Sequence, residues 1–172
     1  MKLWIPVSVI ALGLSLIGYA VFLRSSDEDE ILECLDTLAE TVRLNESETN
    51  PVLRGVRINA AFADIFTKDV SVRIPDIAEI GSDRRDLAGA AAQVGGHYRT
   101  ADVRFGSTNI AIDPSKTTAA VTTEATVSAL RYDGQARMDT RGVTFRFDKV
   151  SGDWRIASIA VAPRNGNHRG EP

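Results

Sequence analysis

Cysteine and histidine are scarce in this chain of 172 residues, which contains one cysteine and two histidines. A single cysteine excludes an internal disulfide, and so few nitrogen and sulfur ligands argue against a dedicated zinc site. Cys34 lies among Ile31, Leu35 and Leu38 in an apolar helical pattern, which favours a buried small hydrophobic residue over a reactive or intermolecular thiol. We therefore expect no metal.

Basic residues are outnumbered as well, since 20 Lys and Arg against 23 Asp and Glu give a formal net charge of −3. Without Lys2 and Arg24, 18 basic residues remain against the 23 acidic ones, a net of −5. That balance argues against a nucleic-acid-binding face and against docking on anionic lipid. The chain also lacks the G-x-S-x-G, P-loop and dinucleotide-binding glycine motifs. Motifs therefore indicate no cofactor and no catalytic residue.

One long apolar run is present, the 21 uncharged residues LWIPVSVIALGLSLIGYAVFL from Leu3 to Leu23. At about 1.5 Å per residue, a helix of this length spans the roughly 30 Å of a bilayer's hydrocarbon core. We expect residues 1–24 to be an uncleaved transmembrane anchor. The alternative is a cleaved signal peptide, but the run is longer than a usual signal and no A-x-A site follows it.

The short basic start favours a cytoplasmic N-terminus. The prediction is a single-pass protein of a bacterial inner membrane, with residues 3–23 in the lipid bilayer and the C-terminal domain on the periplasmic side. Residues 25–162 are about one domain in size. Residues 163–172 show no apolar periodicity, which predicts a disordered tail.

Three helices and one short strand are predicted before residue 100. Apolar residues recur at helical spacing in residues 26–44, and Asn50-Pro51 supplies a cap and a first helical residue for a helix to about Phe66. Val70, Val72 and Ile74 alternate with polar residues, which is typical of a strand over residues 68–74. A third helix follows a cap at Ser82 or Asp83 and ends at Gly95-Gly96.

From Ala101 onward the apolar period is two, and turn signals at residues 113–116, 133–134 and 151–152 divide four long strands. Residues 119–129 alternate small apolar and polar side chains, which is typical of a half-buried antiparallel strand. Gly106 and Gly142 lie inside strand patterns and are predicted bulges or bends.

This order of elements resembles the nuclear transport factor 2-like fold, which ketosteroid isomerase, scytalone dehydratase and the SnoaL-like polyketide cyclases share. Residues 60–76, AAFADIFTKDVSVRIPD, look like the second helix of that fold running into its first strand. Residues 143–161, VTFRFDKVSGDWRIASIAV, look like its last hairpin. The resemblance implies an α+β domain over about residues 28–162, with a cone-shaped, curved antiparallel sheet and three packing helices behind the N-terminal transmembrane helix.

The resemblance also places any active site in the mouth of the cone, but it transfers no catalytic base. Ketosteroid isomerase has its catalytic aspartate directly before a proline, and here Ile74 precedes Pro75. An isoleucine cannot accept a proton, and Asp76 lies two positions further on with a side chain expected to point elsewhere.

Five residues are candidates for lining the cavity: Arg73, His97, Tyr98, Asp139 and Arg141. His97 and Tyr98 are a candidate proton-transfer pair at the mouth, but a loop histidine and a tyrosine ring that covers the core edge is the favoured interpretation. Arg73 is a candidate partner for a carboxylate, although an isolated arginine on a short strand usually faces solvent. Asp139 and Arg141 share a strand phase with Val143 and point inward unless Gly142 is a bulge. We favour the bulge, which makes both of them surface charges.

The sequence therefore predicts a membrane-anchored, non-catalytic domain that binds a protein partner or a small apolar ligand. An isomerase, dehydratase or cyclase acting in the cone is the alternative. Partners are expected to be a second copy, packed through small neutral residues such as Thr122, Thr126 and Ser128, or a component of a membrane complex.

Overall fold

The computed structural model describes residues 26–48, 50–75 and 83–164. The predicted anchor, Asp76 and most of the predicted tail lie outside these residues. Within them, no helix is long and apolar enough to span a membrane.

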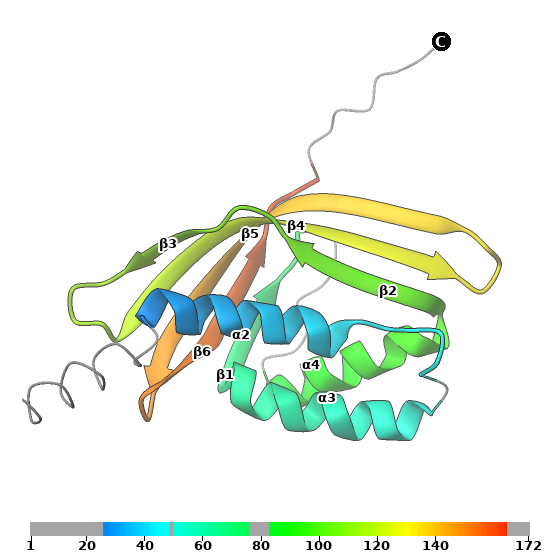
Figure 1. Ribbon diagram of the computed structural model, residues 1–172, viewed down its shortest axis with the longest axis horizontal. Helices are drawn as coiled ribbons and strands as arrows, with labels where there is room; N and C mark the ends of the chain where they lie inside the picture. Colours follow the sequence, from blue (N-terminus) through cyan, green and yellow to red (C-terminus); the bar gives the residue numbers. More distant parts are fainter. Residues whose placement is uncertain (1–25, 49, 76–82, 165–172) are drawn as a thin grey trace, which may run out of the picture.

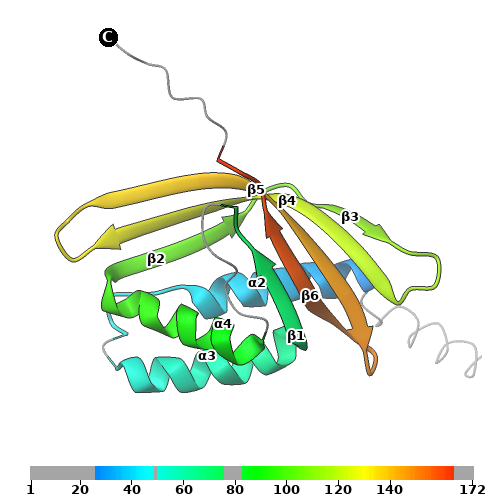
Figure 2. The same cartoon turned by 180° about the vertical axis from the view of Figure 1, so that it is seen from behind.

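Three α-helices and a six-stranded sheet make up the described domain, which confirms the α+β prediction. The helices are α2 (Asp27–Val42), α3 (Pro51–Ile65) and α4 (Arg84–Gln93), and the 3-10 turn η1 (Val94–Gly96) follows α4. The strands are β1 (Phe66–Arg73), β2 (Tyr98–Phe105), β3 (Asn109–Ile112), β4 (Thr118–Arg131), β5 (Ala136–Val150) and β6 (Asp153–Val161). In Figure 1, α2 crosses in front of the curved sheet, with α3 and α4 together below β2. From behind, α3 and α4 lie in front of α2 (Figure 2).

Side chains at the helix starts explain where the helices begin. Ser26 is extended and forms a capping box with Asp29. The side chains of Asn50 and Asp83 accept hydrogen bonds from backbone N–H groups in the first turns of α3 and α4. Because Ser26 has a non-helical backbone, α2 starts at Asp27.

The strand order is β1-β6-β5-β4-β2, and β3 also pairs with β4. Strands β2 to β6 pair antiparallel, as predicted, but β1 pairs parallel with β6. The expectation of a wholly antiparallel sheet is therefore wrong for its first strand. The reason is connectivity, since α4 and η1 lie between β1 and the meander and allow β1 to join the far edge.

The bulge or bend predicted at Gly106 is a break between two strands. Phe105 ends β2 opposite Ala125 and Asn109 begins β3 opposite Thr122, so residues 106–108 lie opposite only two residues of β4. The prediction of a bulge at Gly142 is wrong, because Gly142 pairs in regular register with Glu124. The irregularity in this part of the sheet lies instead in β6, where Ala157 is the extra residue between Ile156 and Ser158.

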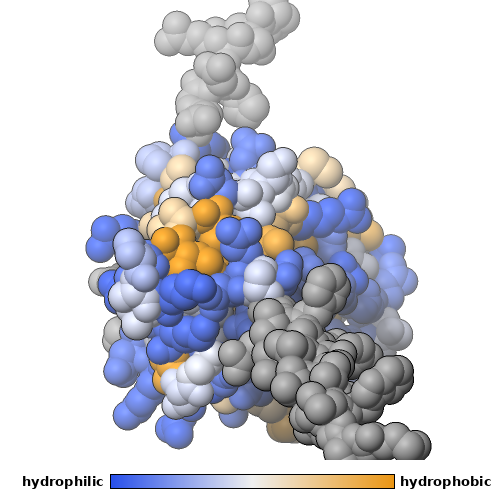
Figure 3. Space-filling view, turned by 60° about the vertical axis from the view of Figure 1, so that its left-hand side comes forward, coloured by the Kyte–Doolittle hydropathy of each residue, from blue (hydrophilic) through white to orange (hydrophobic). Residues whose placement is uncertain are grey.

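The core fills the inside of the curved sheet. Phe145 and Phe147 of β5, Trp154 and Ile156 of β6, and Ile31 and Leu35 of α2 are almost completely buried. The sheet's other face, called the outer face here, carries small polar side chains such as Thr122 and Thr144, both exposed. Figure 3 shows a mostly hydrophilic side of the domain with hydrophobic residues gathered near its middle and a few others elsewhere, so some apolar surface stays accessible.

Candidate functional site

Asp139 and Arg141 lie on the inner face of the long hairpin formed by β4 and β5. The regular register at Gly142 keeps them in phase with the buried residues Val143 and Phe145. The Arg141 side chain is only 14% exposed, and that of Asp139 is 40% exposed. The favoured interpretation of both as surface charges is therefore corrected, because it depended on a bulge that is not present.

The two side chains form an ion pair that a third residue extends. Arg141 donates from Nε to Oδ2 of Asp139 at 2.9 Å, and Arg164 donates from Nη2 to the same oxygen at 3.0 Å. The hydrogen bond from Arg164 is the largest cause that lowers the pKa of Asp139, with Arg141 adding to it. Asp139 is therefore a firmly ionised carboxylate held between two guanidinium groups.

Small and apolar side chains surround this group on the neighbouring strands. Ala125 of β4 lies opposite Arg141, and Val127 lies opposite Asp139. Val103 of β2 pairs with Val127, which is 43% exposed although it shares a face with buried residues. The inner face of the hairpin thus combines an exposed aliphatic surface with a fixed ionic group.

The other three candidates do not join this group. Arg73 is exposed on β1, on the face opposite the buried Val70 and Val72. His97 is exposed after η1, and Tyr98 is half-buried at the start of β2, opposite Arg131. None of the five candidates lines any of four surface hollows among the described residues, of about 320 to 770 Å³. A His97–Tyr98 proton-transfer pair is not supported by this placement.

The largest of these hollows, about 770 Å³, is one that the sequence did not indicate. We call it the outer trough, and it is lined by residues 43–45, 100–102, 104, 128–130 and 136–138. Leu44 and Ala101 form an isolated antiparallel bridge, so the segment after α2 lies beside β2. No motif marks this trough because its lining comes from four separate segments that meet only in the fold.

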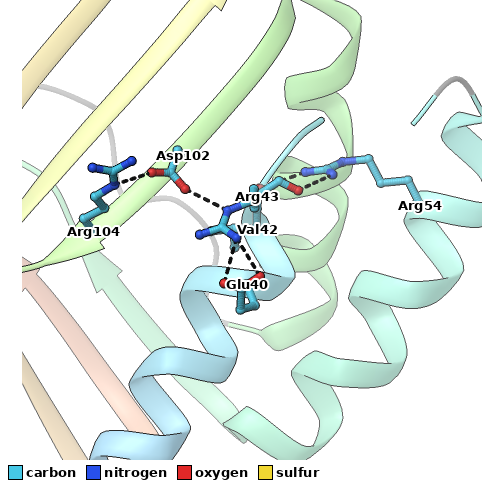
Figure 4. A network of polar contacts seen from close by, with 6 residues as sticks. All are labelled: Glu40, Val42, Arg43, Arg54, Asp102 and Arg104. Carbon is cyan, nitrogen blue, oxygen red and sulfur yellow. Dashed lines mark hydrogen bonds and ion pairs between the residues drawn. The ribbon is translucent and has the colours of Figure 1, made fainter. Parts of the chain in front are cut away.

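A network of charged residues fixes the end of α2 to β2 beside the trough (Figure 4). Asp102 accepts from Arg43 Nε and from Arg104 Nε, each at 2.8 Å, and Arg43 also pairs with Glu40. On the other side, the buried Arg54 donates to the carbonyl oxygens of Val42 and Arg43 at 3.0 and 2.9 Å. These carbonyls belong to the last turn of α2, where intrahelical partners are missing.

The single cysteine is partly buried. Burial raises the pKa of the Cys34 thiol to about 12, in agreement with its predicted role as a small hydrophobic residue. Among the described residues, no group of three or more His, Cys, Asp or Glu side chains is placed to hold a metal ion.

A curved sheet whose inner face carries the polar group, covered by three helices, defines the nuclear transport factor 2-like class of α+β domains. Residues 57–160 match the family model described as SnoaL-like domain, and the chain belongs to that family. No curated protein matches the sequence significantly.

Solved structures share the fold at low identity. A nuclear transport factor 2-like superfamily protein from Salmonella enterica is 14% identical, with a TM-score of 0.64 over 85% of this chain and 96% of its own. A protein of this fold class from Novosphingobium aromaticivorans is 15% identical, with a TM-score of 0.63 over 92% and 90% of the two chains. A putative scytalone dehydratase from the same organism is 14% identical, with a TM-score of 0.61 over 82% and 93%. At these identities the likeness shows the fold alone.

Proposed function

We propose that this protein is a membrane-anchored, non-catalytic binding domain. Its ligand is a small molecule with an apolar body and an anionic group, bound on the inner face of the β4–β5 hairpin. The observation that carries the proposal is the Arg141–Asp139–Arg164 group beside the exposed Val127. The aliphatic surface would contact the apolar body, while the two guanidinium groups attract the anion.

The same group argues against proton abstraction. A general base works best with a pKa near the working pH, whereas two arginines lower the pKa of Asp139. Ile74, which stands where ketosteroid isomerase has its base, has no group that accepts a proton. An isomerase, dehydratase or cyclase remains the alternative, since the family includes such enzymes and a putative scytalone dehydratase shares the fold.

The ligand proposal predicts that anilinonaphthalene sulfonate, an aromatic anion, binds the full-length protein and gains fluorescence. Val127→Trp fills the surface beside Asp139, so we expect binding to weaken by about tenfold or more, or roughly 1.4 kcal/mol. Thr144→Trp adds the same bulk on the outer face of β5 and is the matched control. Equal affinities of the two variants would contradict the proposal, and so would Asp139-dependent turnover of a hydroxy-ketone or an unsaturated ketone.

We also propose that residues 3–23 anchor the domain, with residues 25–172 on the periplasmic side. The full chain, expressed in a bacterium, should stay in the membrane fraction after alkaline washing, and a version without residues 2–24 should not. A C-terminal alkaline phosphatase fusion should be active, because that enzyme matures only outside the cytoplasm. A shorter, soluble mature protein would instead indicate the cleaved signal peptide.

A partner is part of this proposal, either a second copy or another component of a membrane complex. The outer face offers a neutral surface for a second copy, where the Thr126 and Thr140 hydroxyls are hydrogen-bonded at 2.9 Å. Light scattering of the detergent-solubilised protein from the same preparation measures this directly. A monomer that co-purifies with nothing would contradict the partner.

A further inference from the structure

We infer that the outer trough is a docking site for an acidic segment of a partner protein that also carries an apolar side chain. This inference is independent of the ligand proposed for the inner face of the hairpin. The two surfaces lie on opposite faces of the sheet and are tested with different variants.

The trough is distinguished from the rest of the outer face by its arginines. Elsewhere that face is made mainly of threonine and serine, but Arg43 and Arg104 line the hollow, with Asp102 as its single acidic lining residue. Arg137 also lines the hollow from the end of β5, although it shares the strand phase of Asp139 on the inner face. This local positive charge stands out in a chain whose residues after Arg24 carry a net charge of −5. An acidic partner segment is the complement of such a surface.

Two of these arginines are held in place before any partner arrives. One oxygen of Asp102 accepts from Arg43 Nε and the other from Arg104 Nε, so a single carboxylate orients both guanidinium groups. The Arg104 side chain remains 81% exposed, and no described residue pairs with its terminal nitrogens. Arginines oriented in advance lose less conformational entropy on binding, which favours their use at interfaces.

An apolar contact lies within the same hollow. Met138 is 76% exposed, the largest exposed fraction among the large hydrophobic residues of the described chain, and Leu130 lines the trough beside it. An exposed methionine next to arginines is typical of a surface that binds a peptide, because its flexible side chain adapts to different shapes.

The shape of the hollow favours a protein segment over a metabolite. The trough crosses four extended segments, from residues 43–45 to β5, on the solvent face of the sheet, so it does not enclose its occupant. Small-molecule sites usually bury most of their ligand, whereas a segment that remains attached to its own protein needs only one side covered.

The test measures binding of a short fluorescein-labelled peptide of Asp, Glu and Leu to the full-length protein in detergent, by fluorescence anisotropy. We expect saturable binding that weakens as salt is added, and no binding of an analogue with Lys in place of the acidic residues. Arg104→Glu should weaken binding by at least about tenfold. The Arg104 side chain is exposed, so this variant is expected to fold.

The matched control is Arg146→Glu, which reverses an exposed arginine on the outer face of β5, outside the trough. It should change the affinity less than about twofold, whereas Met138→Ser should weaken binding without changing its salt dependence. Absence of binding at low salt, equal effects of the trough and control reversals, or equal binding of the Lys analogue would overturn the inference. Self-association that the trough variant abolishes would reassign the surface to a second copy.

Discussion

Asp27 connects the start of α2 to two turns of the sheet. Its carboxylate accepts from Lys149 Nζ at 2.5 Å and from Trp154 Nε1 at 3.0 Å, and Lys116 lies 3.4 Å away. The hydrogen bond from Lys149 is the largest cause, followed by that from Trp154, that lowers the pKa of Asp27 to about 2. The first residue of the described helix is thus bound to both the β3–β4 and the β5–β6 turns.

A pH-dependent contribution to stability follows from this lowered pKa. The ionised carboxylate stabilises the fold above the unfolded-state pKa of about 3.9, and this contribution is lost as the pH falls toward 2. We expect Asp27→Asn to lower the free energy of unfolding at pH 6, and its difference from the wild type to shrink between about pH 4 and pH 2. Urea unfolding at several pH values measures this.

The control for Asp27 is Glu28→Gln, which removes an exposed charge from the same helical turn. Its difference from the wild type should stay small across the range. A difference for Asp27→Asn that does not change with pH would show that the charge of Asp27 is not what stabilises the turn.

At the scale of elements, Arg54 is what joins α3 to the end of α2 (Figure 4). Its side chain is 2% exposed, and it pairs with Glu48 at 2.6 Å while donating to the two terminal carbonyl groups of α2. Removing the buried guanidinium would take away the donor that the Val42 and Arg43 carbonyl oxygens and the Glu48 carboxylate share, and an unsatisfied buried acceptor is costly.

Arg54→Met is therefore expected to lower the free energy of unfolding by about 3–5 kcal/mol. Arg57→Met is the matched control, because Arg57 contacts the same Glu48 but is 47% exposed, and it should cost only about 0–1 kcal/mol. Equilibrium urea unfolding compares them. Similar losses in the two variants would contradict the role of Arg54 in fixing the end of α2.

Element identity followed from local patterns, and element pairing did not. The stripes of apolar residues in 26–44 and the cap at Asn50-Pro51 predicted α2 and α3 correctly, because capping and amphipathicity are local. The parallel partner of β1 depends on contacts between residues about 90 positions apart, such as Phe66 with Ile156, which no local pattern contains. A glycine inside a strand pattern is typical of a bulge, but Gly142 and its neighbours Arg141 and Val143 pair regularly with β4.

The candidate site was predicted in part for the same reason. Asp139 and Arg141 were found because strand alternation is local, whereas Arg164 joins them only through the fold. Asp102 and Arg104 share one strand phase, but their relation to Arg43 needs the segment after α2 to lie beside β2. A site whose residues come from several elements is therefore not predicted by local sequence patterns.

At the scale of the whole molecule, the sheet is not equally supported along its length. In the part of the chain that the structure describes, β6 pairs with β5 from Val143 to Val150, and no strand pairs with the outer edge of β5 from 136 to 141. Over residues 136–141, β5 thus has a neighbouring strand, β4, on one side only.

Hydrogen exchange should show this difference. The N–H groups of Met138 and Thr140 point away from β4 by the alternation of the ladder, as does that of Thr144, which lies opposite Ala160 of β6. We expect the amides of Met138 and Thr140 to exchange roughly a hundredfold faster or more than that of Thr144. Equal protection of the three would show that the outer edge of the hairpin is covered.

The position of Asp27 also sets how the domain responds to tension. The chain enters the described domain at Ser26, and the next residue is bonded to Lys149 and Trp154 at the β5–β6 turn. A force on the chain at Ser26 therefore acts first on the contacts between Asp27 and the β5–β6 turn. Only when these contacts break can it unwind α2 from its N-terminal end. If residues 3–23 hold the protein in a membrane, the domain carries its load through a hairpin and not through a helix end.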